Sequence, residues 1–456
     1  MKHGIFLSLA LGLMAMTQPS AAAVTEAEAN RLGADLTPMG AEKAGNAAGT
    51  IPAWDGGLTA PPPGVTVDPS THLPDPFASE TPLYTVTSAN MAQYGAQMSD
   101  GQKALMTAYP DSYFLKVYPT HRSCAYPAHV YAAAKRNAVT GQLVNDGNGV
   151  TGATMAVPFP IPQSAREVLW NHELNYRGFQ LWRENASAVP TQNGDFTLEL
   201  STDQYIYSWS DPSMTSTEDM KNISYYFLRQ GVAPPANSGS MTIFNNTLDQ
   251  VADPRRVWNY RPGERKVKRT MGVQYDLIAP TGDGIRTSDT FQVFNGAGDH
   301  YDWELLGKQE KIIPYNTNGF ASAKYEYKDI VRKHNLNQDP LRYELHRVWA
   351  LEAKLKPGFT HVFATRRQIY QDEDSWAAVG ATLFDGAGKI SRVQEAHMFN
   401  YYDQPMCAVS SEVIYDINGG RYHVIALRNQ QKPVKFEVKL DQSKFGPSGM
   451  RSLGVR

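Results

Sequence analysis

The chain has 456 residues and a formal net charge of −2 at pH 7, with 42% hydrophobic and 19% charged residues. A charge this close to zero argues against nucleic acid or a strongly anionic surface as the main partner. The length allows one large domain or two smaller ones. No apolar run approaches the roughly 20 residues that a helix needs to cross a bilayer.

The first residues predict export. Lys2 and His3 provide a charged start, residues 5–16 form an apolar run, and residues 21–23 are three alanines. This order is typical of a secretory signal peptide, with cleavage expected just before Val24. The cleavage region contains no cysteine, so a lipoprotein anchor is not expected. We therefore predict a signal peptide over residues 1–23 and a soluble periplasmic protein.

The chain contains two cysteines, Cys124 and Cys407. In an oxidising compartment they could form a disulfide. Such a bond would close a very long loop, which the chain-entropy treatment values at roughly 4–5 kcal/mol before strain. Two free buried thiols are the alternative.

The first part of the mature chain, residues 24–80, is predicted to be a short helix followed by an extended segment. The helix is expected over Thr25–Leu36, and a Pro/Gly-rich stretch without usable periodicity follows it. Residues 81–456 are expected to form a single α+β domain. Its helices are expected mainly between residues 88 and 176, at 88–118 with an interruption at Pro110, at 127–137 and at 163–176.

From about residue 195 to residue 440 the hydrophobic period changes to two, which predicts strands joined by turns. The clearest case is Leu341–Leu355, where odd positions are mostly apolar and even positions are mostly charged. This alternation is typical of an antiparallel sheet covered on one face and solvent-exposed on the other. Helices first and a long meander after them indicate an α+β fold.

The stretch 366–392 contains four acids and a Gly-Lys pair. A nucleotide-binding P-loop would need a glycine at Leu383 and a Ser or Thr at Ile390, so it is excluded. An EF-hand calcium loop starting at Asp372 would need a glycine at Ala377 and a glutamate at Leu383, so it is excluded too.

Two tight turns are the favoured interpretation of this stretch. "QDEDS" and "DGAGK" are predicted to reverse the chain in a three-stranded meander, with their charged side chains in water. An irregular metal site that uses Asp372 and Asp374 is a minor alternative.

The sequence contains no G-x-S-x-G elbow, no H-E-x-x-H helix and no paired Cys-x-x-Cys clusters. We therefore expect no catalytic residues, no metal and no cofactor, and an enzyme is the less favoured class. A basic cluster flanks a Pro-Gly turn and is interpreted as the exposed end of a hairpin, with a docking patch for an anionic partner as the alternative. It consists of Arg265, Lys266, Lys268 and Arg269.

Arg347 breaks the apolar face of the clearest strand. A buried guanidinium must be paired, so Arg347 either lies at an exposed end, pairs with an acid of a neighbouring strand, or anchors a ligand head group at the mouth of an apolar cavity. Aromatic residues also concentrate in the strand half, where they form ordinary core or line such a cavity. The predicted ligand-binding residues are Trp258, Tyr260, Trp303, Arg347, Trp349 and Trp376.

Several stretches carry a resemblance to a known family. "NYRPGERKVKR", "YDWELLGKQEKIIPYN", "HRVW…LKPG…DEDSW" and "YDINGGRYHVIAL" resemble an exported proteobacterial family of unknown function. Its members have about 450 residues and are often encoded near RND-type exporters. The resemblance extends from about Leu36 to the C-terminus.

More distantly, residues 255–269 and 369–392 resemble strands of the lipoprotein carriers LolA and LolB. Those carriers fold as an incomplete antiparallel barrel closed by helices around an apolar cavity. Residues 366–368 depart from the Lys-Arg-aromatic run expected there, and Gly380-Ala381 replaces bulkier residues. The second departure could alter the volume of a cavity. The family implies no catalytic residues.

The leading hypothesis is a monomeric periplasmic carrier or chaperone for a hydrophobic molecule such as a lipid. An RND-type exporter or an outer-membrane protein is the expected partner. The first alternative is a periplasmic hydrolase of lipid esters or glycans. The second is an assembly factor that binds a membrane partner through a sheet edge and carries nothing.

Overall fold

A computed structural model describes residues 24–436 and 438–454. The predicted signal peptide, residues 1–23, lies outside the described residues. Within the described part, no helix combines the length and the apolar composition that a membrane crossing requires.

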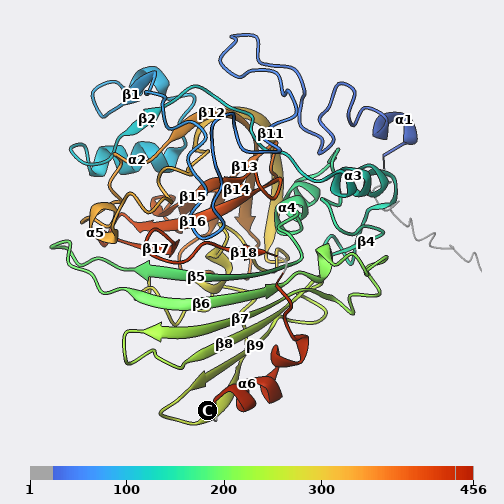
Figure 1. The fold of residues 1–456 in the computed structure, drawn as a ribbon, viewed down its shortest axis with the longest axis vertical. Coiled ribbons are helices and arrows are strands. Elements are labelled where there is room, and N and C mark those ends of the chain that lie inside the picture. The colour runs from blue at the N-terminus through green and yellow to red at the C-terminus, as the bar shows by residue number, and fades with distance from the viewer. Residues whose placement is uncertain (1–23, 437, 455–456) are drawn as a thin grey trace, which may run out of the picture.

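The fold is dominated by one sheet of 16 strands that does not close on itself (Figure 1). Its strands follow the order β1-β2-β12-β13-β14-β15-β16-β17-β5-β6-β7-β8-β9-β10, with β11 added to β12 and β18 added to β5. Neighbours run antiparallel except at a single parallel pairing of β2 with β12. The predicted α+β fold with a large, incomplete antiparallel barrel is therefore confirmed.

The strands of the sheet between residues 84 and 270 are β1 Tyr84–Val86, β2 Leu115–Val117, β5 Gln180–Ala188, β6 Glu199–Ile206, β7 Ile223–Ala233, β8 Met241–Thr247, β9 Arg256–Arg261 and β10 Lys266–Thr270. Those of the later part are β11 Tyr301–Pro314, β12 Tyr343–Leu355, β13 Arg366–Asp372, β14 Ala378–Phe384, β15 Ile390–Tyr401, β16 Met406–Asp416, β17 Arg421–Leu427 and β18 Lys435–Phe436. A separate hairpin pairs β3, Gln142–Val144, with β4, Gly149–Thr151.

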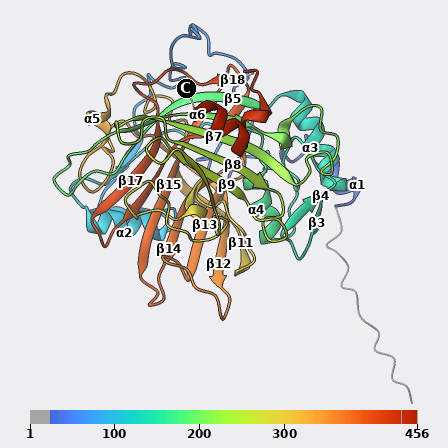
Figure 2. The same cartoon turned by 90° about the horizontal axis from the view of Figure 1, so that it is seen from below.

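The sheet bends where β17 meets β5. Figure 2 shows β7–β9 running across the direction of β12–β15. The pairing there is broken: β5 pairs with β17 at Ala186 and Ala188, and with β18 at Leu181 and Trp182. The first half of β5 is thus paired to a different segment from the second half, which lets the two parts of the sheet diverge.

Helices cover both faces of the sheet. Apolar side chains of α3, Ala128–Thr140, and α4, Ala165–Glu173, pack in one cluster with β12–β15. We call this side of the sheet the inner face. It continues onto β5–β8, because Val434 and Phe436 pack both against this cluster and against a cluster of aromatic side chains on β5–β8. On the outer face, α2, Asp100–Ala108, packs against β14 and β15, and α6, Pro447–Gly454, packs against β9 and β10.

Two predicted helices are shorter than expected. The first ends after one turn, as α1 over Glu26–Ala29, because Gly33 takes a φ of +88° and Leu32 and Leu36 form β-bridges instead. The predicted helix 88–118 is resolved into a 3₁₀ turn at Met91–Tyr94, then α2, then β2. Its helical part starts at the Ser99 cap, where the Ser99 hydroxyl and the Gln102 side chain form a capping box.

The prediction that one face of β12 is exposed to solvent is wrong for the first half of the strand. Glu344 and His346 occupy even positions but are 0% and 1% exposed. Glu344 accepts hydrogen bonds from Arg342 Nε at 2.6 Å and from the His121 backbone N–H at 2.8 Å. Residues from before α3 therefore cover this half of the strand.

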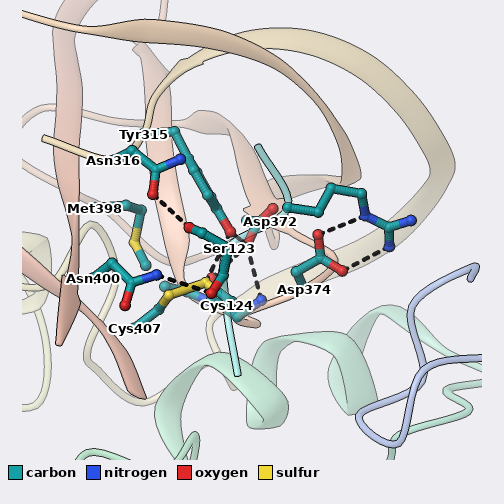
Figure 3. Close-up of a disulfide and its surroundings, with 12 residues drawn as sticks. Ser123, Cys124, Tyr315, Asn316, Asp372, Asp374, Met398, Asn400 and Cys407 are labelled. Carbon is teal, nitrogen blue, oxygen red and sulfur yellow. Dashed lines mark hydrogen bonds and ion pairs between the residues drawn. A yellow bond between two sulfur atoms is a disulfide. The ribbon is translucent and has the colours of Figure 1, made fainter. Parts of the chain in front are cut away.

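The predicted disulfide between Cys124 and Cys407 is formed, with an S–S distance of 2.06 Å (Figure 3). It links the segment that precedes α3 to the start of β16 across a sequence separation of 283 residues. Such a bond is typical of a protein that folds in an oxidising compartment.

Candidate functional site

The corner between β13 and β14 carries the most unusual chemistry in the fold. A tight turn forms there, as the sequence predicts, but the prediction that its charged residues lie in water is wrong. Asp372, Glu373 and Asp374 are 0%, 1% and 4% exposed. The second corner, residues 385–389, is exposed apart from a half-buried Asp385, in agreement with its prediction.

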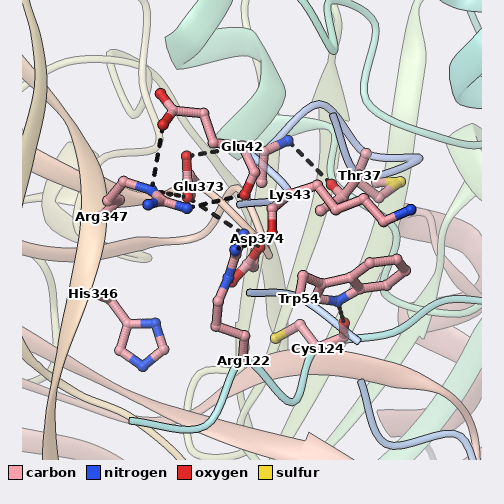
Figure 4. Close-up of polar contacts among 12 residues, drawn as sticks. Thr37, Glu42, Lys43, Trp54, Arg122, Cys124, His346, Arg347, Glu373 and Asp374 are labelled. Atoms are coloured by element: carbon pink, nitrogen blue, oxygen red, sulfur yellow. Dashed lines mark hydrogen bonds and ion pairs between the residues drawn. The ribbon is translucent and has the colours of Figure 1, made fainter. Parts of the chain in front are cut away.

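Three cations, Arg122, Lys308 and Arg347, compensate the buried acids of this corner, and Figure 4 shows the two arginines. Glu373 accepts from Arg347 Nε at 2.6 Å and pairs with Lys308 Nζ at 2.9 Å. Asp374 accepts two hydrogen bonds from Arg122, at 2.9 Å from Nε and 2.7 Å from Nη2. We call this set, Arg122, Lys308, Arg347, Glu373 and Asp374, the corner network.

The N-terminal extended segment closes the corner network from outside. Arg347 Nη2 donates to the backbone carbonyl oxygens of Glu42 and Ala44, at 2.9 and 2.6 Å, and Trp376 Nε1 donates to that of Met39 at 2.7 Å. Arg347 thus pairs with an acid next to the neighbouring strand, which is one of the alternatives that the sequence left open.

A second group of polar residues lies beside the disulfide (Figure 3). The carboxylate of Asp372 accepts at Oδ2 from the backbone N–H and the hydroxyl of Ser375, at 2.8 and 2.6 Å, and from Tyr315 at 3.3 Å. The Tyr315 ring stacks on His346 with 3.8 Å between ring centres. Burial, and after it the nearby Asp374 carboxylate, raises the pKa of Asp372.

Far from this corner, the inner face of β5–β8 combines aromatic rings with charge. Tyr205 lies 4.6 Å from Phe227 between ring centres. Asp203 on β6 is fully buried and binds two arginines: Arg229 Nε donates to it at 2.8 Å, and Arg183 Nη2 at 3.4 Å. Burial would raise the pKa of Asp203, but Arg229 and Arg183 outweigh it, so the pKa is lowered.

Several buried N–H groups on or beside this face have no hydrogen-bond partner within the described residues. They are Nε of Arg183 and both Nε and Nη2 of Arg286 and of Arg428. Arg428 Nη1 donates to Tyr401 OH, and Arg286 Nη1 donates to the Thr290 carbonyl at 2.8 Å and to Glu412 Oε2 at 3.3 Å. Unpartnered buried N–H groups are costly, so the remaining donors are the ones that an additional acceptor would satisfy. We call Arg183, Arg229, Arg286 and Arg428 the inner arginines.

A pocket of about 350 Å³ opens where β5, β6 and β17 meet at one end of the inner face. His423 on β17 lines it, and the Nδ1 of this buried ring has no partner. Burial, and after it the charges of Arg286 and Arg229, lowers the pKa of His423 well below its usual value. The other lining residues are Ala188, Val189, Thr191, Asp195, Phe196, Thr197, Glu199, Pro234, Gly282 and Asp283.

Of the six predicted ligand-binding residues, Arg347 belongs to the corner network and the other five fall into two places. Trp303, Trp349 and Trp376 pack in the inner cluster with α3 and α4, where Trp349 and Trp376 lie 6.1 Å apart between ring centres. Trp258 and Tyr260 lie instead on the outer face of β9, against α6, where Tyr260 OH donates to the Gly454 carbonyl at 3.0 Å. Their contact with a ligand stays a prediction.

The inner arginines were not predicted from the sequence. Arg183 and Asp203 occupy the same alternating positions as the apolar Leu181 and Tyr205. Arg347 was predicted to be a site residue because it is a charge on an apolar strand face, and Arg183 and Asp203 are charges of the same kind.

Comparison with known proteins identifies relatives. The family described as "Protein of unknown function (DUF1329)" matches residues 85–451. An uncharacterized protein of Pseudomonas aeruginosa is 44% identical over 449 residues, covering 98% of this chain and 97% of that protein. The predicted membership in an exported family of unknown function is thereby confirmed at the level of the family. The expected link to exporter genes stays a prediction.

Two solved structures share part of the fold. A DUF1329 family protein from Desulfovibrio piger is 14% identical and covers 62% of this chain and 95% of that chain, with a TM-score of 0.43. A LolA superfamily protein from Nitrosomonas europaea is 11% identical and covers 63% of this chain and all of that chain, with a TM-score of 0.37. Similarities of this size carry no argument about function.

Proposed function

Because the chain belongs to the DUF1329 family, whose function is unknown, its role has to be inferred from its own residues, and we propose that it is a periplasmic carrier for a hydrophobic molecule with an anionic head group. The supporting observation is the inner face of β5–β8. There, aromatic rings lie beside arginine N–H groups that have no partner among the described residues.

The apolar part of such a ligand needs an enclosing surface. Burying one CH₂ group is worth about 0.8 kcal/mol, so moving a chain of about sixteen carbons through water unprotected costs on the order of 13 kcal/mol. That free energy corresponds to nanomolar or tighter binding. The rings of Tyr205, Tyr207, Tyr225 and Phe227 form one contiguous buried cluster, against which such a ligand would pack.

The head group is assigned by charge. Arg183 and Arg229 share the single carboxylate of Asp203, and their side chains are 19% and 29% exposed. Two guanidinium groups with one carboxylate leave a net positive charge on this face. Guanidinium groups bind carboxylates and phosphates through paired hydrogen bonds, so a fatty acid or an anionic phospholipid fits these arginines.

The volume of the pocket adds a requirement. About 350 Å³ is at the lower end of the range for small-molecule sites, and neither the inner arginines nor these rings line the pocket. A long acyl chain therefore reaches them only if the two parts of the sheet move apart. The broken pairing between β17 and β5 is where this opening is expected, because the residues between Leu427 and Lys435 make no strand pairing with β5.

The decisive experiment is lipid extraction from protein purified without detergent. The carrier proposal predicts close to one lipid or fatty acid per chain. Arg229→Met should reduce the bound amount at least tenfold for an anionic lipid, while a neutral analogue of the same chain length should bind the variant as well as the wild type.

A pair of aromatic residues tests the placement of the apolar part. Phe227→Asp, on the inner face of β7, should abolish lipid binding without preventing export, whereas Trp258→Asp, under α6 on the outer face, should leave binding intact in the folded protein. A lipid-free protein that hydrolyses esters or glycosides would favour the hydrolase instead. A lipid-free, inactive protein that purifies with a membrane complex would favour the assembly factor.

A further inference from the structure

Three buried side chains from two strands come together beside the disulfide. His346 lies on β12, Asp372 is the last residue of β13, and Asp374 lies in the corner that follows (Figures 3 and 4). Each offers one possible metal-ligating atom, and these three atoms all lie within 4.8 Å of one another. The side chains of all three are at most 3% exposed.

The imidazole of His346 presents a lone pair to this group. Its Nε2 lies 3.0 Å from Glu344 Oε2, and Glu344 also accepts from the guanidinium of Arg342. Glu344 Oε2 is an acceptor for Nε2–H, so in the neutral imidazole with this tautomer Nδ1 carries the lone pair. Nδ1 is the atom that points toward Asp372, 3.9 Å from Oδ1.

Asp372 Oδ1 is itself without a hydrogen-bond partner, although the residue is fully buried. The hydrogen bonds of this carboxylate, from Ser375 and Tyr315, all reach the other oxygen, Oδ2. The unpartnered Asp372 Oδ1 therefore faces His346 Nδ1 inside the protein. The 3.9 Å between these two atoms is too long for a hydrogen bond.

A cation between them resolves this arrangement. Zinc binds histidine nitrogen and carboxylate oxygen at about 2.0–2.2 Å, so two ligands of a tetrahedral ion are about 3.4 Å apart. The observed 3.9 Å separation needs to contract by only about half an ångström. We propose that His346, Asp372 and Asp374 bind one divalent transition-metal ion of the zinc class.

The surroundings fit this assignment. One imidazole with two carboxylates suits zinc, manganese or iron(II) better than calcium or magnesium, which prefer oxygen ligands alone. Glu344 holds the far nitrogen of His346, as carboxylates commonly do for metal-bound histidines. Both Asp374 oxygens accept from Arg122, and each keeps a second lone pair for the ion.

This site escapes a search for metal-binding loops because its ligands do not lie in one loop. Asp372 and Asp374 were considered as an irregular site from the sequence, but the third ligand, His346, is 26 residues earlier on the neighbouring strand. The inference is independent of the carrier proposal, since the site lies at the other end of the sheet from the inner arginines.

The test uses untagged full-length mature protein with its disulfide formed. It is purified without chelator, analysed for bound metals by mass spectrometry, then stripped and titrated separately with zinc, manganese and iron(II). We expect close to one ion per chain. His346→Gln and Asp372→Asn should each weaken binding about 100-fold or more, and Glu344→Gln should weaken it about 10- to 100-fold.

The control is His397→Gln, which removes another fully buried histidine, one with no carboxylate partner on either ring nitrogen. This variant should bind metal like the wild type. X-ray absorption of the zinc-loaded wild type does not depend on any variant folding, and should show nitrogen and oxygen ligands at about 2.0–2.1 Å with a single imidazole.

The proposal is overturned if folded wild-type protein takes up none of the three ions, if the His346 and Asp372 variants bind as tightly as the wild type, or if absorption spectra show no imidazole. Failure here would leave lipid binding unchanged, and failure of lipid binding would leave metal uptake unchanged.

Discussion

Glu373 is the acid on which the corner network depends, and its removal is the most direct test of the energetics described above. The substitution Glu373→Gln keeps the shape of the side chain but removes its charge. Arg347 and Lys308, now 2.6 and 2.9 Å from Glu373 oxygens, would then face an uncharged amide.

The expected loss follows from burial. Breaking a buried ion pair by removing one partner destabilises a protein by about 3–5 kcal/mol. Arg347 keeps two backbone carbonyl partners, and Lys308 keeps Glu42 at 3.0 Å, so the lower end of the range applies. We therefore expect Glu373→Gln to lower the free energy of unfolding by about 3 kcal/mol.

Glu42→Gln is the matched control. Glu42 also pairs with Lys308, but its side chain is 49% exposed, so its pair is worth less than about 1 kcal/mol. Both variants are compared with the wild type by urea unfolding, followed by circular dichroism with the disulfide intact. Similar losses for the two variants would refute the argument that burial makes Glu373 the dominant acid. A double variant, Arg347→Met with Glu373→Gln, should lose less than the sum of the two single losses, because it leaves one fewer buried charge.

Three further predictions concern stability. Replacing Cys124 and Cys407 by serine should lower stability by about 5 kcal/mol, because the bond closes a loop of 283 residues, and reductant should do the same to the wild type in urea unfolding. Burial raises the pKa of Glu395 to about 7, so the folded state binds a proton that the unfolded state releases near pH 4.5. The stability that this group contributes is present below pH 4.5 and is lost as the pH rises to 7, by on the order of 3 kcal/mol. Glu395→Gln should flatten that part of the profile of unfolding free energy against pH. An unchanged slope would contradict the role of Glu395. Gly101→Ala should destabilise α2 by about 1–3 kcal/mol although alanine favours helices, because its Cβ would lie 2.6 Å from Val393 Cγ1, and a gain in stability would contradict this packing argument.

The sequence predicts the two turns correctly, but it does not predict which distant residues bury one of them. "DGAGK" forms an exposed turn as predicted, because its Asp and Gly residues determine the turn by themselves. "QDEDS" also turns, but it is buried by Arg122 and by backbone from residues 42–44, which lie more than 240 positions away. Nothing within the five residues distinguishes the two corners.

His346, the third proposed metal ligand, was not predicted for the same reason: the residues that cover it are distant in the sequence. His346 stands at an even position of β12 among charged neighbours, so alternation assigned it to a solvent-exposed face. Alternation reports which residues share a face, and it does not report what lies over that face. The cover comes from Tyr315 and from the segment near Cys124, both outside the strand.

The inner arginines were missed for a different reason. A charge on an apolar strand face needs a partner, and in the sequence only Arg347 was singled out on this ground. Applied to β5–β7 it would have selected Arg183, Asp203 and Arg229, which pair with one another across three adjacent strands. Here the sequence contained the signal, and only the pairing across strands required the structure.

The position of the disulfide along the chain has a consequence for biogenesis. Cys407 follows Cys124 by 283 residues, so the bond cannot form before this whole intervening stretch has been synthesised. Until then the Cys124 thiol has no native partner and can form bonds with other thiols. A disulfide exchange step that acts after synthesis of residue 407 is therefore required to correct such bonds.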